Sequence, residues 1–361
     1  MPLNGNLALG FILYVNDIGH MAMKTPIWIH GRQRFAERSA DRRPMRRGHV
    51  RHATACLCAA GALVAGLALP VANAADPEPD TKSDKPWSVT LEAGMQHDDS
   101  VSIDALDNRS GQADRARVFN LGGDYTLLQK SALPIKLSYA FAKTSYRDLK
   151  AFNLQSHTAF VSTRKKVAGL DAGFLYGFSH TDLDGKPFLN FHTVTPTLGH
   201  GLTTNWYVLA GYNYQNKTFH TAKSRNAQVN GLSLDNFFFF NETRSYIKAG
   251  YRFEMENAAR NEFDFAGHYL NIGLKSALGA SPGDATIRFS YQYYLRDYTN
   301  ETPSISRERE DQRHTAKAEI AVPVHEHAQM KFSYKYIKAH SNLSTSDFDE
   351  NVINVSLALK F

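Results

Sequence analysis

Two short clusters near the end of the chain hold residue types that catalyse reactions or bind metals. His340, Ser341 and Asn342 are consecutive, and a histidine beside a serine could activate the hydroxyl as a nucleophile. Successive side chains of a strand point to opposite faces, so His340 and Ser341 cannot meet in regular β-structure. His325 and His327 have the spacing of metal ligands, but no third ligand lies near them. We therefore expect a polar loop start and a solvated turn, with no enzyme activity, cofactor or metal.

A larger set of charged residues alternates with apolar residues. If the apolar residues face lipid, the charged ones face a lumen. The expected inward bases of the later segments are Lys248, Arg252, Lys275, Arg288, Arg296, Arg313, Lys317, Lys331 and Lys335, against Glu254 and Glu319. The earlier segments would contribute Glu92, Asp124 and Asp171, against Lys136. Walls of opposite charge would orient polar solutes and favour anions at the basic wall. Alternatively, these groups pair with one another and close the lumen.

The elements that would position these residues are β-strands. In the last segment Ile353, Val355, Leu357, Leu359 and Phe361 share one face, and polar or small residues share the other. Such alternation is typical of strands between lipid and a lumen, and no segment has a sustained helical period. The predicted strands are 87–97, 116–128, 134–146, 153–164, 169–180, 187–199, 205–216, 228–240, 245–256, 266–278, 285–297, 312–322, 328–339 and 350–361. This predicts an all-β fold, a transmembrane antiparallel up-and-down β-barrel of about 14 strands.

In part of the chain the alternation does not show which residues face lipid. The lengths of the gaps between strands give a second test of the barrel. The fourth, sixth and eighth strands alternate poorly, and no face can be assigned to the residues 237–240. Long gaps, including 298–311, alternate with short ones, as expected for outer loops and periplasmic turns. A soluble β-sandwich is the alternative. The leader, the terminal Phe361 and the 22 Phe and 17 Tyr residues favour the membrane barrel.

A basic leader precedes the first strand. The chain has 361 residues and a formal net charge of +6, but nine Lys or Arg against three acids lie within residues 1–74. The remainder holds 32 residues of each sign, which argues against nucleic-acid binding. We divide the chain into an N-terminal extension or mis-annotated start (1–44), a secretory signal peptide (45–74), a periplasmic linker (75–86) and the barrel (87–361).

We predict that signal peptidase cleaves after Ala74. Arg46, Arg47 and Arg51 precede the apolar run 55–69, and Ala72 and Ala74 supply the small side chains of a cleavage site. A lipoprotein signal is the rival, but both cysteines lie near the beginning of the run. N-terminal sequencing of the mature protein checks this, and a mature chain that still begins at Met45 would contradict it.

The chain also resembles known outer-membrane proteins. The residues Tyr334, Tyr336, Leu357, Leu359 and Phe361 are similar to the signal that the barrel assembly machinery reads. The stretches 99–101, 296–298 and 341–342, with Arg309 and Asp311, resemble the barrel of the surface lipoprotein assembly modifier family. The resemblance covers about 275 residues. Family members commonly carry tetratricopeptide repeats before the barrel, where this chain has only the linker.

Together these features predict a location in the outer membrane of a Gram-negative bacterium. Our first hypothesis is a channel for small polar or anionic solutes. The alternative, which the resemblance implies, is an export or assembly barrel that helps a surface lipoprotein or another protein reach the cell surface. The expected partners are outer-membrane lipid, the barrel assembly machinery and, under the alternative, a surface lipoprotein.

Overall fold

The computed structural model describes residues 85–128, 131, 133–279 and 284–361. The N-terminal extension, the signal peptide and most of the linker lie outside the described residues. Among the described residues, no helix is long and apolar enough to cross a membrane.

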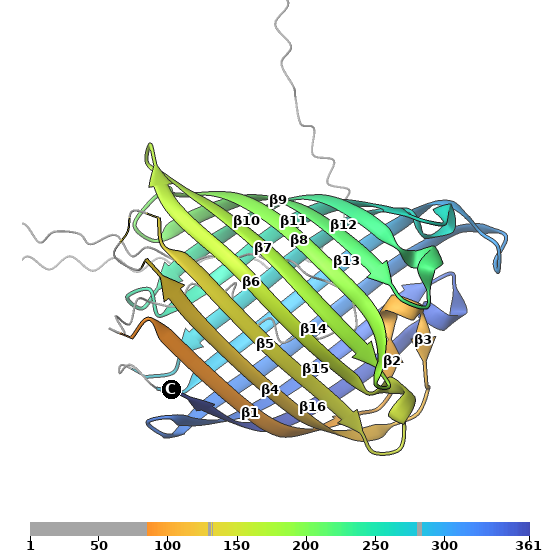
Figure 1. Ribbon diagram of the computed structural model, residues 1–361, viewed down its shortest axis with the longest axis horizontal. Coiled ribbons are helices and arrows are strands. Elements are labelled where there is room, and N and C mark those ends of the chain that lie inside the picture. The colour runs from red at the N-terminus through yellow and green to blue at the C-terminus, as the bar shows by residue number, and fades with distance from the viewer. Residues whose placement is uncertain (1–84, 129–130, 132, 280–283) are drawn as a thin grey trace, which may run out of the picture. The chain divides into compact units, whose positions relative to one another are not determined.

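Fourteen antiparallel strands close into a barrel (Figure 1), which confirms the predicted fold class. Each strand pairs with its neighbours along the chain, and β1 closes the sheet against β16. The barrel strands are β1 (Trp87–Asp98), β4 (Asp114–Leu127), β5 (Ile135–Tyr146), β6 (Leu154–Val167), β7 (Leu170–Leu183), β8 (Lys186–Gly201), β9 (Trp206–Phe219), β10 (Ala227–Phe240), β11 (Ser245–Ala258), β12 (Phe265–Ala277), β13 (Thr286–Thr302), β14 (Arg307–His325), β15 (Ala328–Ser341) and β16 (Phe348–Lys360).

The connections differ between the two ends of the barrel. We call the end near Trp87 and Phe361 the terminal end and the opposite one the loop end. Residues 99–113, between β1 and β4, form the loop L1, which contains β2 (Ser102–Ile103), the 3₁₀ turn η1 (Asp104–Leu106) and β3 (Asn108–Arg109). Four other loop-end connections carry single 3₁₀ turns, η2 (Lys150–Phe152), η3 (Lys223–Arg225), η4 (Asn261–Phe263) and η5 (Ser344–Ser346). Outer-membrane barrels carry their longer loops outside, so we expect the loop end to face the exterior.

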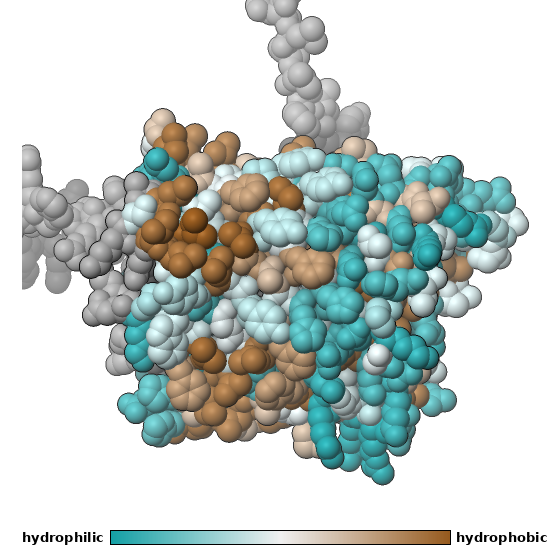
Figure 2. All heavy atoms as spheres, viewed as in Figure 1, coloured by the Kyte–Doolittle hydropathy of each residue, from teal (hydrophilic) through white to brown (hydrophobic). Residues whose placement is uncertain are grey.

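The outer surface is apolar toward the terminal end and hydrophilic toward the loop end (Figure 2). Toward the loop end, the outer surface of six successive loop-end hairpins repeats one arrangement. A tyrosine on the first strand hydrogen-bonds to a histidine or asparagine on the next, in the pairs Tyr139–His157 (2.8 Å), Tyr176–His192 (3.0 Å), Tyr212–Asn230 (2.6 Å), Tyr251–His268 (2.7 Å), Tyr291–His314 (2.7 Å) and Tyr334–Asn351 (2.6 Å). An aromatic residue two positions after each tyrosine lies opposite the histidine or asparagine. This ring has the composition of an interfacial girdle, with an apolar body and a polar tip.

The structure explains the strands whose alternation is weak in the sequence. Phe237 is fully buried inside the barrel, whereas Phe238 is exposed on the outside, so the aromatic run alternates like any other strand segment. Phe237 and Phe239 pack with Tyr246 in an apolar cluster on the lumen side. The pattern is obscured because apolar residues occupy both faces.

The predicted long gap over residues 298–311 is wrong. β13 extends to Thr302 and β14 begins at Arg307, with an irregular register between Asp297 and Glu301. Both strands thus continue beyond their neighbours at the loop end as a hairpin (Figure 1). Such strands lose their apolar alternation in water, so the sequence pattern ends before the hydrogen-bonded ladder does.

Replacing Gly94 with alanine should weaken barrel closure. A Cβ at Gly94 would lie 2.5 Å from the carbonyl oxygen of Val355 and 2.6 Å from the Cβ of Ser356, so β1 and β16 would have to separate. Overpacking of this kind costs about 1–3 kcal/mol. The readout is the temperature at which heat-modifiable electrophoretic migration is lost. Gly122→Ala on β4 is the matched control, because no atom lies within 4 Å of its added Cβ. Equal temperatures for both variants would contradict the argument.

Candidate functional site

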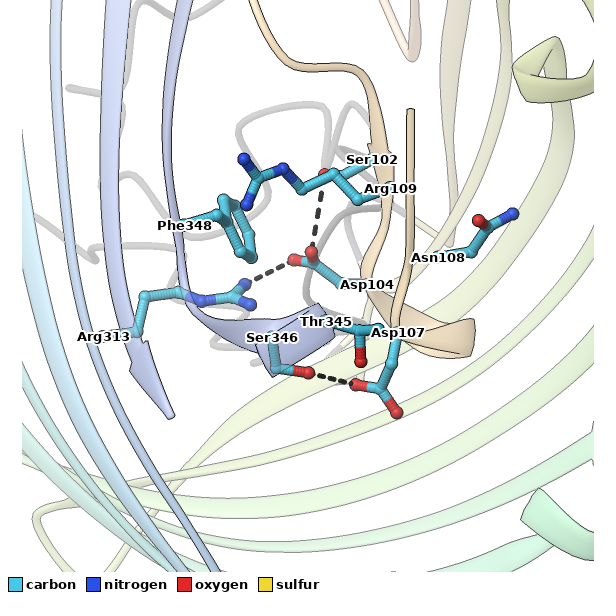
Figure 3. A pocket seen from close by; sticks show the side chains of 9 residues that line it. All are labelled: Ser102, Asp104, Asp107, Asn108, Arg109, Arg313, Thr345, Ser346 and Phe348. Carbon is cyan, nitrogen blue, oxygen red and sulfur yellow. Dashed lines mark hydrogen bonds and ion pairs between the residues drawn. The ribbon is translucent and has the colours of Figure 1, made fainter. Parts of the chain in front are cut away.

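L1 lies inside the barrel at the loop end (Figures 1 and 3). Its two short strands pair as Ser102 with Arg109 and Ile103 with Asn108, and η1 forms the tip between them. Asp107 ends the turn in the left-handed region, with φ 51°, and its backbone N–H donates to the carbonyl of Asp104. This compact hairpin presents an apolar side and an acidic side to different walls of the barrel.

The apolar side of L1 packs against the wall formed by β5 to β9. Val101 and Ile103 are almost completely buried. They belong to one cluster with Phe152, Phe188, Leu189, Phe191 and Phe219. The loop end therefore has a small hydrophobic core of its own inside the lumen. This core also accounts for the poor alternation of β8, because two of its aromatic residues point inward.

The acidic side of L1 meets Arg309 of β14. Arg309 donates to both carboxylate oxygens of Asp107 (Nη2–Oδ1 2.9 Å, Nη1–Oδ2 3.1 Å) and to both of Asp311 (Nε–Oδ1 2.8 Å, Nη2–Oδ2 2.7 Å). Ser346 donates to Asp107 (3.0 Å) and accepts from Arg309 (2.9 Å). The guanidinium also lies over the ring of Tyr298. A buried arginine is thus fully occupied by two carboxylates, one from the loop and one from its own strand.

Two further arginines bind the tip of L1 from different directions. Arg225, in η3, contacts Asp107 (Nη2–Oδ2 2.5 Å) and donates to the carbonyl of Ala105 (3.3 Å). Arg313, on β14, forms an ion pair with Asp104 (Figure 3). A cavity of about 70 Å³ lies beside the tip, lined in part by these arginines. L1 therefore bridges walls on opposite sides of the mouth.

The charge of Asp107 is strongly stabilised. Burial alone would raise its pKa, but the charges and hydrogen bonds of Arg309 and Arg225 outweigh burial and hold the pKa well below its usual range. A depressed carboxylate pKa contributes docking free energy at every pH above the pKa of the undocked loop. That contribution is lost as the pH falls through the lower, docked value. Mild acidification is therefore expected to leave L1 in place.

The predicted lumen cations line the inner wall, where most of them meet carboxylates. Toward the terminal end, Lys331 contacts Glu92 (2.8 Å). The other pairs are Lys136–Asp124 (3.3 Å), Lys248–Asp235 (3.1 Å), Arg252–Glu254 (3.3 Å), Arg288–Glu319 (3.1 Å), Lys317–Glu319 (3.4 Å) and Lys335–Glu350 (2.8 Å). Asp171 accepts a hydrogen bond from Tyr207 (3.3 Å), and Lys275 is buried on β12.

Of the two alternatives that the sequence left open, this pairing favours the network of paired charges over the basic wall. Asp235, Asp311 and Glu350 also face inward, and the sequence reasoning left them out. Asp104 and Asp107 add charge from L1, which alternation within strands could not have placed. The later strands therefore form a mixed ion-pair network. A selectivity role for its cations stays a prediction.

Arginine and tyrosine alternate on the wall beneath L1. Arg296 lies over the ring of Tyr294 and donates to the hydroxyl of Tyr269 (Nε–OH 2.8 Å). Arg252 lies over the ring of Tyr269, and that hydroxyl in turn donates to Glu254. The aromatic faces support the guanidinium groups, so their positions are fixed independently of L1. The sequence identified the arginines as inward, but not their contacts with the rings of Tyr269 and Tyr294.

The two clusters considered for chemistry are separated or exposed. Ser341 donates to Asp311 (2.6 Å) inside the mouth, whereas the exposed His340 lies 3.8 Å from Asp347. His325 and His327 flank the turn between β14 and β15 and are exposed. No group of three potential metal ligands occurs among the residues that the structure describes.

Most of the residues of β13 to β15 that carry the family resemblance lie together at the mouth. Tyr298, Arg309, Asp311 and Ser341 contact one another there, with Asp311 accepting from the other three. Asn342 donates to the carbonyl of Glu308 (2.8 Å) at the adjoining hairpin. Among the residues that hold L1, sequence reasoning missed Asp104, Asp107 and Arg225. The spacing of two aspartates by three residues was the one available signal for a turn that presents both.

The family model described as "Surface lipoprotein assembly modifier" matches residues 119–361. No curated protein sequence matches the chain. Similar solved structures include an anion-selective porin from Comamonas acidovorans (9% identity, TM-score 0.46, 76% of this chain and 98% of that chain). They also include a loop-deletion mutant of OmpT, an outer membrane protein of Vibrio cholerae (8% identity, TM-score 0.46, 76% of this chain and 98% of that chain).

Proposed function

Because the chain belongs to the surface lipoprotein assembly modifier family, we propose that this barrel helps a lipoprotein to reach the outer surface of the cell, with L1 closing the mouth between clients. The protein is a β-barrel of the Gram-negative outer membrane. The family and the fold are compatible with surface lipoprotein assembly or with a channel. The arrangement of L1 is our reason for preferring assembly.

The observation that carries the proposal is the docking of L1 across the mouth. The loop is held on one side by an apolar cluster and on the other by buried ion pairs of Arg309 and Arg313. Opening such a contact removes an aspartate from a buried arginine, which is unfavourable unless something replaces it. A closure of this strength suits a barrel that opens for a specific client better than one that admits solutes continuously.

L1 is also connected so that it can move as a unit. Its ends join β1 and β4, which are neighbouring strands, and its contacts to η3, β14 and η5 are made by side chains. Release of those contacts and of the apolar cluster would free L1 while the barrel hydrogen bonds remain. We therefore assign L1 the role of a gate on a rigid frame.

The proposal is tested by deleting the gene and labelling intact cells with a membrane-impermeant biotin reagent. At least one lipoprotein should lose its surface label while remaining in the cell, and the wild-type gene should restore it. If the biotinylated lipoproteins of deletion and wild-type cells are the same, the proposed function is wrong.

A disulfide across the gate links this result to L1. The side-chain oxygens of Asp107 and Ser346 are 3.0 Å apart, so the double variant Asp107→Cys, Ser346→Cys places two thiols close together. After signal removal the mature chain is expected to contain no other cysteine. Surface display should fail when the pair is oxidised and return on reduction. Asp107→Cys alone is the control and should display the client in both conditions.

A channel for small polar or anionic solutes is the second candidate. The charged inner wall, with pairs such as Lys331–Glu92, favours it. Conductance of the purified wild-type barrel in planar bilayers separates the candidates, because a solute channel should conduct with L1 docked. An assembly barrel with a closed mouth should conduct little.

A further inference from the structure

We propose that Arg225, Arg309 and Arg313 form a carboxylate-binding site in which Asp104 and Asp107 of L1 act as an internal ligand. An acidic segment with two carboxylates three residues apart would then open the mouth by taking their place. The site is inferred from L1 and its contacts alone. Only the statement that the acidic segment belongs to an exported client rests on the proposed function.

The arginines belong to the frame and the aspartates to the loop. Arg309 and Arg313 project from β14, and Arg225 projects from η3, whereas both aspartates lie in or beside η1. A 3₁₀ turn has about three residues per turn, so side chains three apart lie on one side of it. Asp104 and Asp107 therefore approach the arginines together, as paired carboxylates of a peptide ligand would.

The arginines are positioned without help from L1. Arg225 lies over the ring of Phe263 (4.2 Å to the centroid), Arg309 over Tyr298 (4.7 Å) and Arg313 over Tyr294 (5.3 Å). These rings come from η4 and β13, which keep their place if L1 leaves. Cation–π contacts of this kind hold a guanidinium while its hydrogen-bonding edge stays available to an anion.

The site is selective for planar anions with two oxygens. Arg309 makes two parallel hydrogen bonds to the carboxylate of Asp107, which is the geometry that guanidinium groups form with carboxylates. Ser346 supplies a further donor to the same carboxylate. An amide in place of the carboxylate would present an N–H group to these donors, so asparagine should be a poor ligand.

Exchange of ligands follows from burial. With L1 docked, Arg309 and Arg313 are 6% and 9% exposed. When L1 leaves, Arg309 keeps Asp311 of its own strand, whereas Arg313 loses Asp104 and Arg225 loses Asp107. Separating such pairs without a replacement anion is unfavourable. L1 therefore leaves easily only when another carboxylate arrives. The docked loop therefore competes with other carboxylates for the three arginines. The mouth opens when an acidic segment displaces the loop.

The test uses a barrel whose own ligand is disabled. The variant Asp104→Asn, Asp107→Asn should conduct in planar bilayers more than the wild type. A synthetic peptide of residues 99–113, added at the loop end, should bind the vacated arginines and reduce the current. The same peptide with Asp104 and Asp107 changed to asparagine, and with Asp99 kept, is the matched control. It should need at least about tenfold more peptide for half block, because charged hydrogen bonds are lost.

A second measurement tests the site if the variant Asp104→Asn, Asp107→Asn does not conduct. Binding of the fluorescent peptide to a purified barrel in which L1 is replaced by a short Gly-Ser turn should be saturable. It should weaken when Arg309 and Arg313 are changed to glutamine. Equal affinity of the two peptides, or no binding of either, would overturn the proposal. Because no client is present, loss of binding refutes the carboxylate site, whereas unchanged lipoprotein labelling in deletion cells refutes only the proposed function.

Discussion

Replacing Arg309 with alanine is expected to release L1 and to turn a weakly conducting barrel into an open pore. The change removes one of the two arginines that contact Asp107 and the arginine that contacts Asp311, and it leaves Asp107 with Arg225 alone. Breaking a buried ion pair by removing one member costs about 3–5 kcal/mol. A cost of this size shifts the balance between docked and released loop by about two to four powers of ten. Single-channel conductance in planar bilayers is the first measurement.

Trypsin gives an independent measurement of the same variant. Arg109 lies in L1 and is held by Ser100 (2.9 Å) and by the carbonyl of Asp347 (3.1 Å), so it should resist cleavage in the wild type. Release of L1 should expose it on intact cells. Arg307→Ala is the matched control, because this arginine is exposed at the start of the same strand. If Arg309→Ala behaves like Arg307→Ala in both assays, then Arg309 does not hold the gate.

Deleting Phe361 is expected to remove most of the protein from the outer membrane. Phe361 continues the lipid-facing row of β16, and its backbone exchanges two hydrogen bonds with Val89 of β1 (2.9 and 3.2 Å). Its ring stacks on His327 (5.9 Å between centroids). Closure of the barrel leaves no open edge in lipid, so the residue that completes the β1–β16 seam matters more than an ordinary surface aromatic. The amount of folded barrel in outer-membrane fractions, followed by heat-modifiable migration, is the measurement.

Two control variants separate the backbone from the ring. Phe361→Tyr keeps an aromatic ring and should insert normally, whereas Phe361→Ser keeps the backbone hydrogen bonds and should insert less well. The role of Phe361 in the signal that the barrel assembly machinery reads stays a prediction. The same holds for Tyr334, Tyr336, Leu357 and Leu359. Wild-type levels of the deletion variant in the outer membrane would contradict the role of Phe361.

The strands could be predicted because lipid imposes a period of two on every segment that crosses it. Each of the 14 predicted segments overlaps one barrel strand, and the last strand shows the alternation most clearly. The prediction was weakest in β8 and β10, where inward residues such as Phe191 and Phe237 are apolar because they face packed interior and not water. A single sequence cannot separate an apolar lumen contact from a lipid contact.

The gate could not be predicted because its contacts join distant parts of the chain. Asp107 and Arg309 are held together by the closure of the whole barrel, and no local pattern relates them. The charges of the wall show the same limitation. Alternation places Lys335 inside and also puts Glu350 of the next strand on the inward face, but no pattern in the sequence relates the two residues as partners.

The ring of tyrosine pairs also fixes how high the barrel stands above the lipid. Tyr291 and Tyr293 lie in this ring, and β13 continues past them to Thr302. Between them and Thr302 lies Tyr298, whose ring contacts the guanidinium of Arg309. The gate is thus raised on a rigid collar above the membrane plane, in contact with the surrounding water. An incoming acidic segment would meet the arginines without entering hydrocarbon, so its charge would not have to be neutralised by protonation first. Changes in bilayer thickness should alter the tilt of the barrel. The collar and the gate within it should stay in the aqueous medium and be exposed to its ionic strength.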